Sequence, residues 1–342
     1  MMKPKIVFMG TPEFAASILE SLIKTEVYEI CAVLTQADKP VGRGLKLSLS
    51  PVKVVAQKYG LAVWTPKSIK NISLDENSNG TKILKTTDTE LNSLVNHLNT
   101  TQPVISIVVA YSKIIPESLL QWSPLGFVNV HTSLLPRWRG AAPIQHALFA
   151  GDKKTGVSIM QMDKGLDTGA VYQTAEVEIT AEDDLGSLTD KLLRVATSVV
   201  LETVPLILEK KIIALPQLTE GITYANKWEK ADLNINWTES AAVTLRRIRT
   251  CAPDLGAKTV FKGRNIKVYA AHLVQDSGFQ WQAAGVITEV NKSELIICAG
   301  SDSVDSAKQF IAIDKLQFPG KAVRTIKEVL NGYKFQRGEK FN

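Results

Sequence analysis

The stretch KIVFMGTPEFAASILESLI (residues 5–23) decides the predicted fold, because its apolar pattern changes from that of a strand to that of a helix. Residues 5–9 are a short apolar run without strict alternation, which is typical of a strand buried on both faces of a parallel sheet. Thr11 can cap the following helix, and Pro12 suits its first position. The later apolar residues recur at the spacing of one helix face: Phe14, Ile18, Leu19, Leu22 and Ile23.

Four similar apolar runs follow in the first part of the chain, with helical patterns between them. The runs are EICAVLT (29–35), LAVWT (61–65), VISIVVA (104–110) and FVNVH (127–131). This alternation predicts an α/β fold with a Rossmann-like, doubly wound and mostly parallel sheet. A dinucleotide site and a nicotinamide dehydrogenase are disfavoured, because the first turn lacks the second and third glycines of GxGxxG and Glu13 adds negative charge.

The last third of the chain changes character. TVFKGRNIKVYAA (259–271) and GVITEVNKSELIICAG (285–300) predict hairpins, QFIAID (309–314) a further strand, and RTIKEVLNGY (324–333) a closing helix. This pattern predicts a small β-barrel that resembles the oligonucleotide-binding (OB) fold. We therefore divide the chain into a first domain at 1–206, a linker at 207–223 and a C-terminal domain at 224–342.

Composition and charge narrow the class of protein. The chain has 342 residues, 45% hydrophobic and 22% charged, which is ordinary for a globular protein. Residues 221–342 contain 18 Lys and Arg against 12 Asp and Glu and so carry the whole net charge of +6. This excess fits either a polyanionic partner or simple solubility. The chain has no apolar run of about 18 residues, which excludes a membrane span, and Cys31, Cys251 and Cys298 form no CxxC pair, so we expect a reducing cytoplasm.

A strand end carries the chemically most suggestive pattern, NVHTSLLPRWRGAAPIQ (129–145). In a strand, Asn129 and His131 project from one face while Val130 points to the other. An amide can donate to an oxygen that becomes negative, and an imidazole can exchange a proton near neutral pH. Asp167, in GLDTG, is the best candidate for a carboxylate that orients the ring, whereas Asp163 is as well suited to a structural role. On spacing alone, a turn-capping pair is an alternative to a catalytic one.

No metal-ligand cluster and no nucleophile elbow accompany this motif, so neither a metal site nor a covalent acyl-enzyme is predicted. Residues 71–100 are rich in Asn, Ser, Thr and Asp, which predicts an exposed loop at DENSNG and a helix in the later part.

Together with TGVSIMQMDKGLDTGA (155–170), the motif resembles the folate-dependent formyltransferases, whose members share N-x-H, SLLPxxxG and a later LDxG. RWRGAAPIQ and IMQMDKGLDTG resemble the branch that formylates methionyl-tRNA. Further matches cover nearly the whole chain: KIVFMGTPEFA, residues 34–57, VVAYSKIIP (108–116) and YANKWEKADLNINW (224–237).

The resemblance implies transfer of a formyl group from 10-formyltetrahydrofolate, without a metal, to the α-amine of methionine on initiator methionyl-tRNA. It implies that Asn129, His131 and Asp167 are catalytic. Folate would lie against the SLLP turn and the loop after the fourth strand, with these candidate contacts: Ser133, Leu134, Leu135, Pro136, Ala110, Ser112 and Ile114. The candidate tRNA contacts are Arg43, Lys46, Arg137 and Arg139. We expect a cytoplasmic monomer that serves translation initiation.

Several alternatives and departures remain. Another folate-dependent formyltransferase, acting on an amino sugar or a nucleotide precursor, is the nearest enzymatic rival, and a non-catalytic RNA-binding protein is a rival of another class. The chain departs from the family pattern at Ser112, where Gly is usual, at Leu45, where a basic residue is common, and at Leu255, where proline is usual.

Overall fold

The computed structural model describes residues 2–41, 46–274, 278–300 and 309–342. The chain forms two compact units. Unit 1 consists of Met1–Pro143, Lys154–Glu178 and Thr189–Asn226, and unit 2 consists of Ile144–Lys153, Ile179–Leu188 and Lys227–Asn342. Its helices are α1 (Glu13–Lys24), α2 (Pro51–Lys58), α3 (Asn92–Thr101), α4 (Glu117–Leu120), α5 (Pro143–Ala150), α6 (Leu185–Leu208), α7 (Ala241–Cys251) and α8 (Ile326–Leu330).

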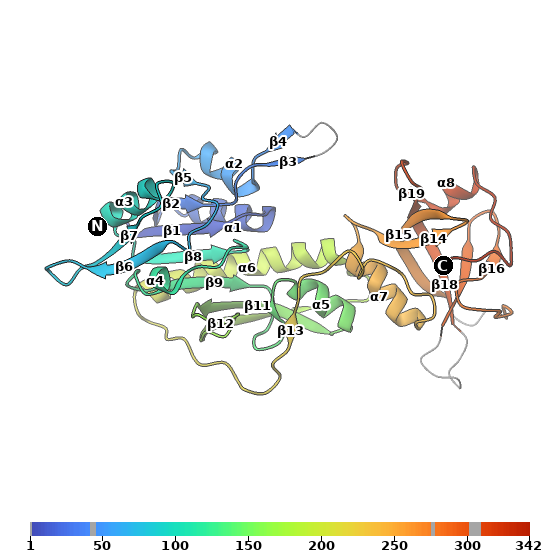
Figure 1. The fold of residues 1–342 in the computed structure, drawn as a ribbon. Coiled ribbons are helices and arrows are strands. Elements are labelled where there is room, and N and C mark those ends of the chain that lie inside the picture. The colour runs from blue at the N-terminus through green and yellow to red at the C-terminus, as the bar shows by residue number, and fades with distance from the viewer. Residues whose placement is uncertain (1, 42–45, 275–277, 301–308) are drawn as a thin grey trace. The chain divides into compact units, whose positions relative to one another are not determined.

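Unit 1 is built on a seven-stranded sheet with the order β12-β11-β9-β8-β1-β2-β5 (Figure 1). The strands are β1 (Lys5–Gly10), β2 (Glu29–Leu34), β5 (Val63–Trp64), β8 (Ile105–Val109), β9 (Phe127–His131), β11 (Lys154–Gln161) and β12 (Val171–Glu178). From β9 to β5 all pairs are parallel, whereas β11 is antiparallel to both β9 and β12. The predicted Rossmann-like, mostly parallel sheet is confirmed.

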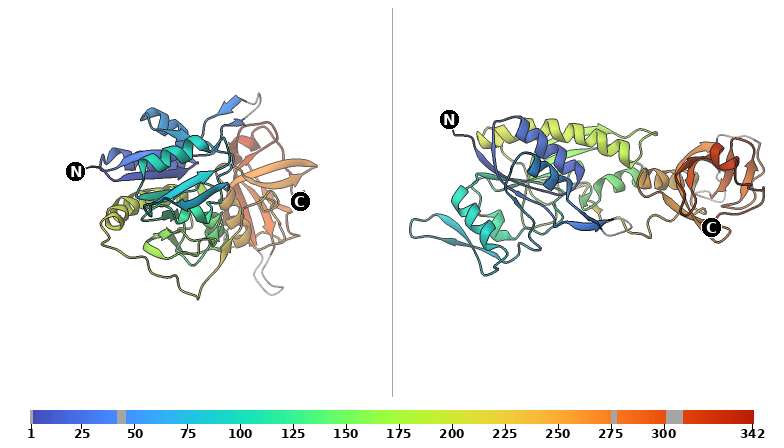
Figure 2. Two further views of the ribbon diagram at one scale, coloured as in Figure 1. Left: turned by 60° about the vertical axis from the view of Figure 1, so that its left-hand side comes forward. Right: turned by 90° about the horizontal axis from the view of Figure 1, so that it is seen from above.

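Helices cover both faces of this sheet (Figure 2). The apolar run of β1 is continuous because both faces of the strand are buried. Val7 and Met9, on one face, pack in a core with Leu94 and Leu98 of α3, and Ile6 and Phe8, on the other face, are equally buried. The first helix begins differently from the prediction. Pro12 is the N-cap residue and makes no side-chain cap, and the buried hydroxyl of Thr11 has no hydrogen-bond partner within the described residues.

Two hairpins extend from the sheet of unit 1. Strands β3 (Lys39–Val41) and β4 (Lys46–Ser48) pair within the stretch 34–57, and β6 (Ile72–Glu76) pairs with β7 (Lys82–Thr86). The exposed loop predicted at DENSNG (75–80) falls at the turn of this second hairpin, whose two strands the sequence did not predict, and the helix predicted in the later part of the tract is α3. The turn of the hairpin uses Asn77, whose side chain accepts hydrogen bonds from the amides of Asn79 and Thr81.

Unit 2 contains the predicted antiparallel barrel (Figure 1). Its strand order is β14-β15-β18-β17-β16, with β19 (Arg324–Thr325) beside β18. The main strands are β14 (Ala257–Phe261), β15 (Arg264–Val274), β16 (Ile287–Val290), β17 (Leu295–Ala299) and β18 (Gln309–Gln317). The two edges are joined by the chain end, because the amides of Phe341 and Asn342 donate to the carbonyls of Gly285 and Val260.

The residues between the two predicted domains pack as part of unit 1. Helix α6 continues to Leu208, two residues past the predicted boundary. Leu215 then pairs with Val171 of β12, and the short β13 (Tyr224–Ala225) pairs in parallel with β10 (Arg139–Gly140). Residues 209–223 therefore belong to unit 1.

The three cysteine thiols of the chain are buried, so their reactivity tests the packing around them in both units. Cys31 is 7% exposed, Cys251 1% and Cys298 0%, and burial raises the pKa of Cys251 to about 11. Because a thiolate is the reactive form, we expect a thiol-specific disulfide reagent at pH 8 to label no cysteine in the native protein and three after denaturation. Rapid labelling of the native protein would contradict this packing.

Candidate active site

Strand β9 presents the two motif side chains at the sheet surface of unit 1. Asn129 is half-buried and His131 is 5% exposed, while Val130 between them is buried on the opposite side. The register places Asn129 between Val108 of β8 and Met160 of β11. The strand therefore holds an amide and an imidazole two residues apart on one face, as predicted.

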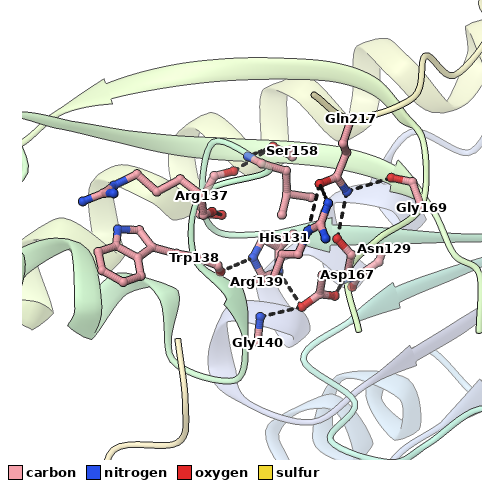
Figure 3. A network of polar contacts seen from close by, with 12 residues as sticks. Asn129, His131, Arg137, Trp138, Arg139, Gly140, Ser158, Asp167, Gly169 and Gln217 are labelled. Carbon is pink, nitrogen blue, oxygen red and sulfur yellow. Dashed lines mark hydrogen bonds and ion pairs between the residues drawn. The ribbon is translucent and has the colours of Figure 1, made fainter. Parts of the chain in front are cut away.

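The hydrogen bonds of His131 define the tautomer of its ring. Nε2 lies 2.9 Å from the carbonyl oxygen of Trp138, and a carbonyl only accepts, so Nε2 carries a proton that it donates. Nδ1 lies 3.7 Å from Oδ2 of Asp167. Nδ1 is therefore the ring nitrogen that can gain or lose a proton on the side of Asn129 and Asp167 (Figure 3).

Asp167 joins this pair from the loop between β11 and β12. Its Oδ1 lies 3.5 Å from Nδ2 of Asn129, and its Oδ2 accepts a hydrogen bond of 2.8 Å from the backbone amide of Gly140. The residue has φ +50°, the left-handed region that a residue with a side chain rarely adopts. The three predicted catalytic residues thus lie together, with the carboxylate 14% exposed.

The neighbouring carboxylate, Asp163, has a different task. Its Oδ1 accepts hydrogen bonds from the amide of Gly165 and the hydroxyl of Thr168. These hydrogen bonds shape the loop that carries Asp167. Within the described residues, Asp163 forms no hydrogen bond with Asn129 or His131. The structural role considered for Asp163 is the one observed.

The SLLP turn after β9 is held in place by Ser158 of β11. Ser158 is fully buried, and its hydroxyl donates to the carbonyl of Ser133 at 2.7 Å and accepts from the amide of Leu135 at 3.2 Å. Ser133 donates in turn to the carbonyl of Arg137 at 2.6 Å. Leu134, Leu135 and Pro136 remain half-buried, so the turn offers apolar surface while its polar groups bond internally.

The loop after β8 holds the other three candidate folate contacts. Ala110, Ser112 and Ile114 are exposed, with Ile114 70% exposed. Ser112 has φ +60°, in the left-handed region that glycine adopts without strain. Burial lowers the pKa of the nearby Lys113, and the charge of Lys39 lowers it further.

The candidate tRNA contacts differ in their surroundings. Arg137 is half-buried, with its guanidinium 4.3 Å from the ring centre of Trp138. Arg139 is 7% exposed, and its Nε and Nη2 donate to Oε1 of Gln217 at 3.1 and 2.8 Å. This burial differs from the exposed placement that a phosphate contact requires. Arg43 and Leu45 lie outside the described residues, and the backbone of Lys46 begins β4.

One departure, Leu255, and two basic residues of the C-terminal charge excess can also be placed in unit 2. Leu255 is 47% exposed. Arg247 donates to the carboxylate of Glu239 and the carbonyl of Asp232, and Arg249 donates to the carbonyls of Thr180 and Ala181. These arginines of α7 hold segments of unit 2 together.

Sequence reasoning missed Gln217. Its Nε2 donates to the backbone carbonyls of Asp167 and Gly169, both at 2.8 Å, and dashed lines join its side chain to that of Arg139 in Figure 3. Gln217 stands in a segment of the sequence without helical or strand periodicity. No sequence pattern therefore indicated that its side chain lies at the site.

In the described part of the chain, no group of three His, Cys, Asp or Glu side chains could hold a metal ion. Among the helices that the structure describes, none combines the length and the apolar composition needed to cross a bilayer.

Comparison with known proteins places this geometry in a family. Residues 4–204 match the formyl transferase family, and residues 227–334 match the formyl transferase C-terminal domain. The chain is 38% identical to the methionyl-tRNA formyltransferase of Nitrosomonas eutropha over 337 residues, covering 98% of this chain and 97% of that protein. The chain belongs to the methionyl-tRNA formyltransferase family of formyl transferases.

Other members of the methionyl-tRNA formyltransferase family match as completely. The enzyme of that name from Symbiobacterium thermophilum is 38% identical, covering 99% of this chain and 95% of the relative. Among solved structures, the sugar 3N-formyl transferase WlaRD aligns with a TM-score of 0.60 at 18% identity, covering 94% of this chain and all of that one. HypX from Aquifex aeolicus, in complex with tetrahydrofolic acid, aligns with a TM-score of 0.57 at 14% identity, covering 95% of this chain and 46% of that one. These two likenesses concern the fold.

Because Ser158 supports the SLLP turn, we predict that replacing it destabilises the protein more than replacing Ser106, another buried serine. Ser158→Ala removes two hydrogen bonds, so we expect it to lower the free energy of unfolding by about 1–3 kcal/mol. Ser106 on β8 is equally buried, but its hydroxyl has no hydrogen-bond partner in the described residues. Ser106→Ala should therefore be nearly neutral. Scanning calorimetry measures both, and equal losses would argue against the support described.

Proposed function

We propose that this chain transfers the formyl group of 10-formyltetrahydrofolate to the α-amine of methionine on initiator methionyl-tRNA, in the cytoplasm and as a monomer. The observation that carries the proposal is 38% identity, along nearly the whole chain, to a protein named for this substrate. The cluster of Asn129, His131 and Asp167 supports it, because it supplies the groups that such a reaction needs.

The reaction begins when the amine nitrogen attacks the formyl carbon. A carbon–nitrogen bond forms, the carbonyl oxygen becomes negative, and the tetrahedral centre then breaks its bond to the donor nitrogen. Nδ2 of Asn129 and protonated Nδ1 of His131 donate to this oxygen. One hydrogen of the Asn129 amide faces Asp167 at 3.5 Å, which leaves the second for the oxyanion.

Asp167 serves this step by proton transfer. Its carboxylate lies 3.7 Å from Nδ1 of His131, close enough to exchange a proton with the ring. The amine loses a proton as it attacks, and the donor nitrogen needs one as it leaves. The carboxylate and the imidazole relay that proton between them.

The formyl donor would lie beside β9, between the SLLP turn and the loop after β8. We assign its contacts to Leu134, Leu135 and Pro136 on the turn and to Ala110, Ser112 and Ile114 on the loop. Ser133 is fully buried and donates to the carbonyl of Arg137, so its side chain shapes the turn and, contrary to the prediction, is not a folate contact. A flat fused ring system suits this surface, because Ile114 of the loop after β8 and Leu166, which directly precedes Asp167, expose 70% and 61% of their surface. A bound ring would remove that apolar area from water.

The tRNA would meet basic residues in both units. Arg43 and Lys46 belong to the Lys- and Arg-rich stretch 39–53, and Arg137 belongs to the turn beside the site. In unit 2, Lys258 stands directly opposite Lys267 in the β14–β15 pair, and both lie with Arg264 along one groove. Like charges placed directly opposite in a sheet destabilise it, and a phosphate between them would remove that repulsion.

Formyl transfer should depend on both motif residues. We expect Asn129→Ala and His131→Ala each to lower kcat by about 10²–10³-fold, because each removes one donor to the oxyanion, while tRNA affinity stays nearly unchanged. The measurement uses purified protein, 10-formyltetrahydrofolate and charged initiator tRNA. His272→Ala is the control, since its side chain is 61% exposed in unit 2. Activity on an amino sugar in place of charged tRNA would instead support the rival formyltransferase.

The lysine pair predicts a change in salt dependence. We expect the double variant Lys258→Gln/Lys267→Gln to reduce the slope of log affinity against log salt by about one per lost phosphate contact. The control Lys154→Gln/Lys211→Gln removes the same charge from lysines paired with Glu176 and Glu209 and should leave the slope unchanged. An equal slope in both double variants would rule out the lysine pair as a phosphate contact.

A further inference from the structure

We propose that Gln217 is a positioning residue for the reaction, because its side chain clamps the Asp167 loop to the turn that carries Gly140. This inference rests on the proposed function for its kinetic consequences. Gln217 lies in the irregular segment after α6, and both ends of its amide are engaged. It contacts neither Asn129 nor His131 in the network drawn in Figure 3.

The donor end of Gln217 holds the loop. Nε2 donates to the carbonyl of Asp167 and to that of Gly169, each at 2.8 Å. These two carbonyls flank a short turn in which Asp167 has φ +50°. A backbone in this region persists only when its surroundings hold it, and the two hydrogen bonds supply such a hold.

The acceptor end of Gln217 holds the turn. Oε1 accepts from Nε of Arg139 at 3.1 Å and from Nη2 at 2.8 Å. Arg139 is 7% exposed and directly precedes Gly140. The amide of Gly140 donates to Oδ2 of Asp167, the oxygen that faces Nδ1 of His131.

The clamp therefore closes a ring that starts and ends at Asp167. One side runs through Gln217 and Arg139 to Gly140, and the other runs directly from Gly140 to the carboxylate. Fixing both the backbone and the side chain of Asp167 leaves the carboxylate one orientation toward His131 and Asn129. Displacement of a reacting group by about 1 Å costs about a hundredfold in rate.

Two substitutions separate the two ends of the amide. Gln217→Met keeps the length of the side chain and removes all four hydrogen bonds. Gln217→Glu keeps an acceptor for Arg139 but cannot donate to the carbonyls of Asp167 and Gly169. The matched control is Gln173→Met, because Gln173 is also half-buried in unit 1 and accepts from the hydroxyl of Thr203 at 2.7 Å.

We expect both Gln217 variants to lower kcat by about tenfold to a hundredfold, with KM for tRNA and for the formyl donor within about twofold of the parent protein. Gln173→Met should leave kcat within about twofold. Full activity of Gln217→Glu would show that only the contact with Arg139 matters and would overturn the clamp.

A double-mutant cycle distinguishes positioning from general stability. If Gln217 acts through Asp167, then adding Gln217→Met to Asp167→Asn lowers kcat no further. Two losses that multiply would mean independent roles and would contradict the proposal.

Hydrogen exchange tests the clamp without any assay of activity. In Gln217→Met, the amides of residues 139–142 and 163–170 should exchange at least about tenfold faster than in the parent protein or in Gln173→Met. Unchanged exchange would overturn the clamp, and so would faster exchange with normal kcat. A parent protein that transfers no formyl group would defeat the proposed function, and exchange alone would then decide whether the clamp exists.

Discussion

The hydrogen bond between the amide of Gly140 and the carboxylate of Asp167 joins the two segments on which the candidate site depends. At 2.8 Å it ties the turn after β9 to the loop after β11. Gly140 has φ +124°, and a Cβ there would lie 2.6 Å from the carbonyl oxygen of Ala225. Only glycine can approach Ala225 this closely. The motif that carries Asn129 and His131 therefore also supplies the backbone amide that holds the carboxylate of Asp167.

The direction of β11 explains why this tie is needed. In a fully parallel sheet, the strand ends that carry active residues meet at one edge. Strand β11 is antiparallel to β9, so its end at Gln161 lies opposite Val128 near the start of β9. The loop must fold back to reach Asn129, and the positive φ of Asp167 is part of that reversal. Gln217 and Arg139 hold the loop in this conformation.

The basic candidates divide into two groups once their surroundings are known. Arg139, Arg247 and Arg249 are held by carbonyls, a glutamine or a carboxylate within their own unit. Lys258 and Lys267 face each other across a strand pair, where an anion would relieve their repulsion. Charge counts along the sequence weigh all these residues equally, so burial and pairing decide which of them suit a phosphate.

The sequence by itself determined the class of the fold, because apolar runs and helical spacing reflect burial patterns that hold along one segment. It also determined that Asn129 and His131 share a face, since alternation within a strand is local. The tertiary structure decided the rest. The hairpin at 72–86, the reversal that delivers Asp167, the burial of Arg139 and the clamp by Gln217 depend on contacts between segments up to 78 residues apart. No local pattern encodes such contacts, because each arises from where the chain returns after packing its core.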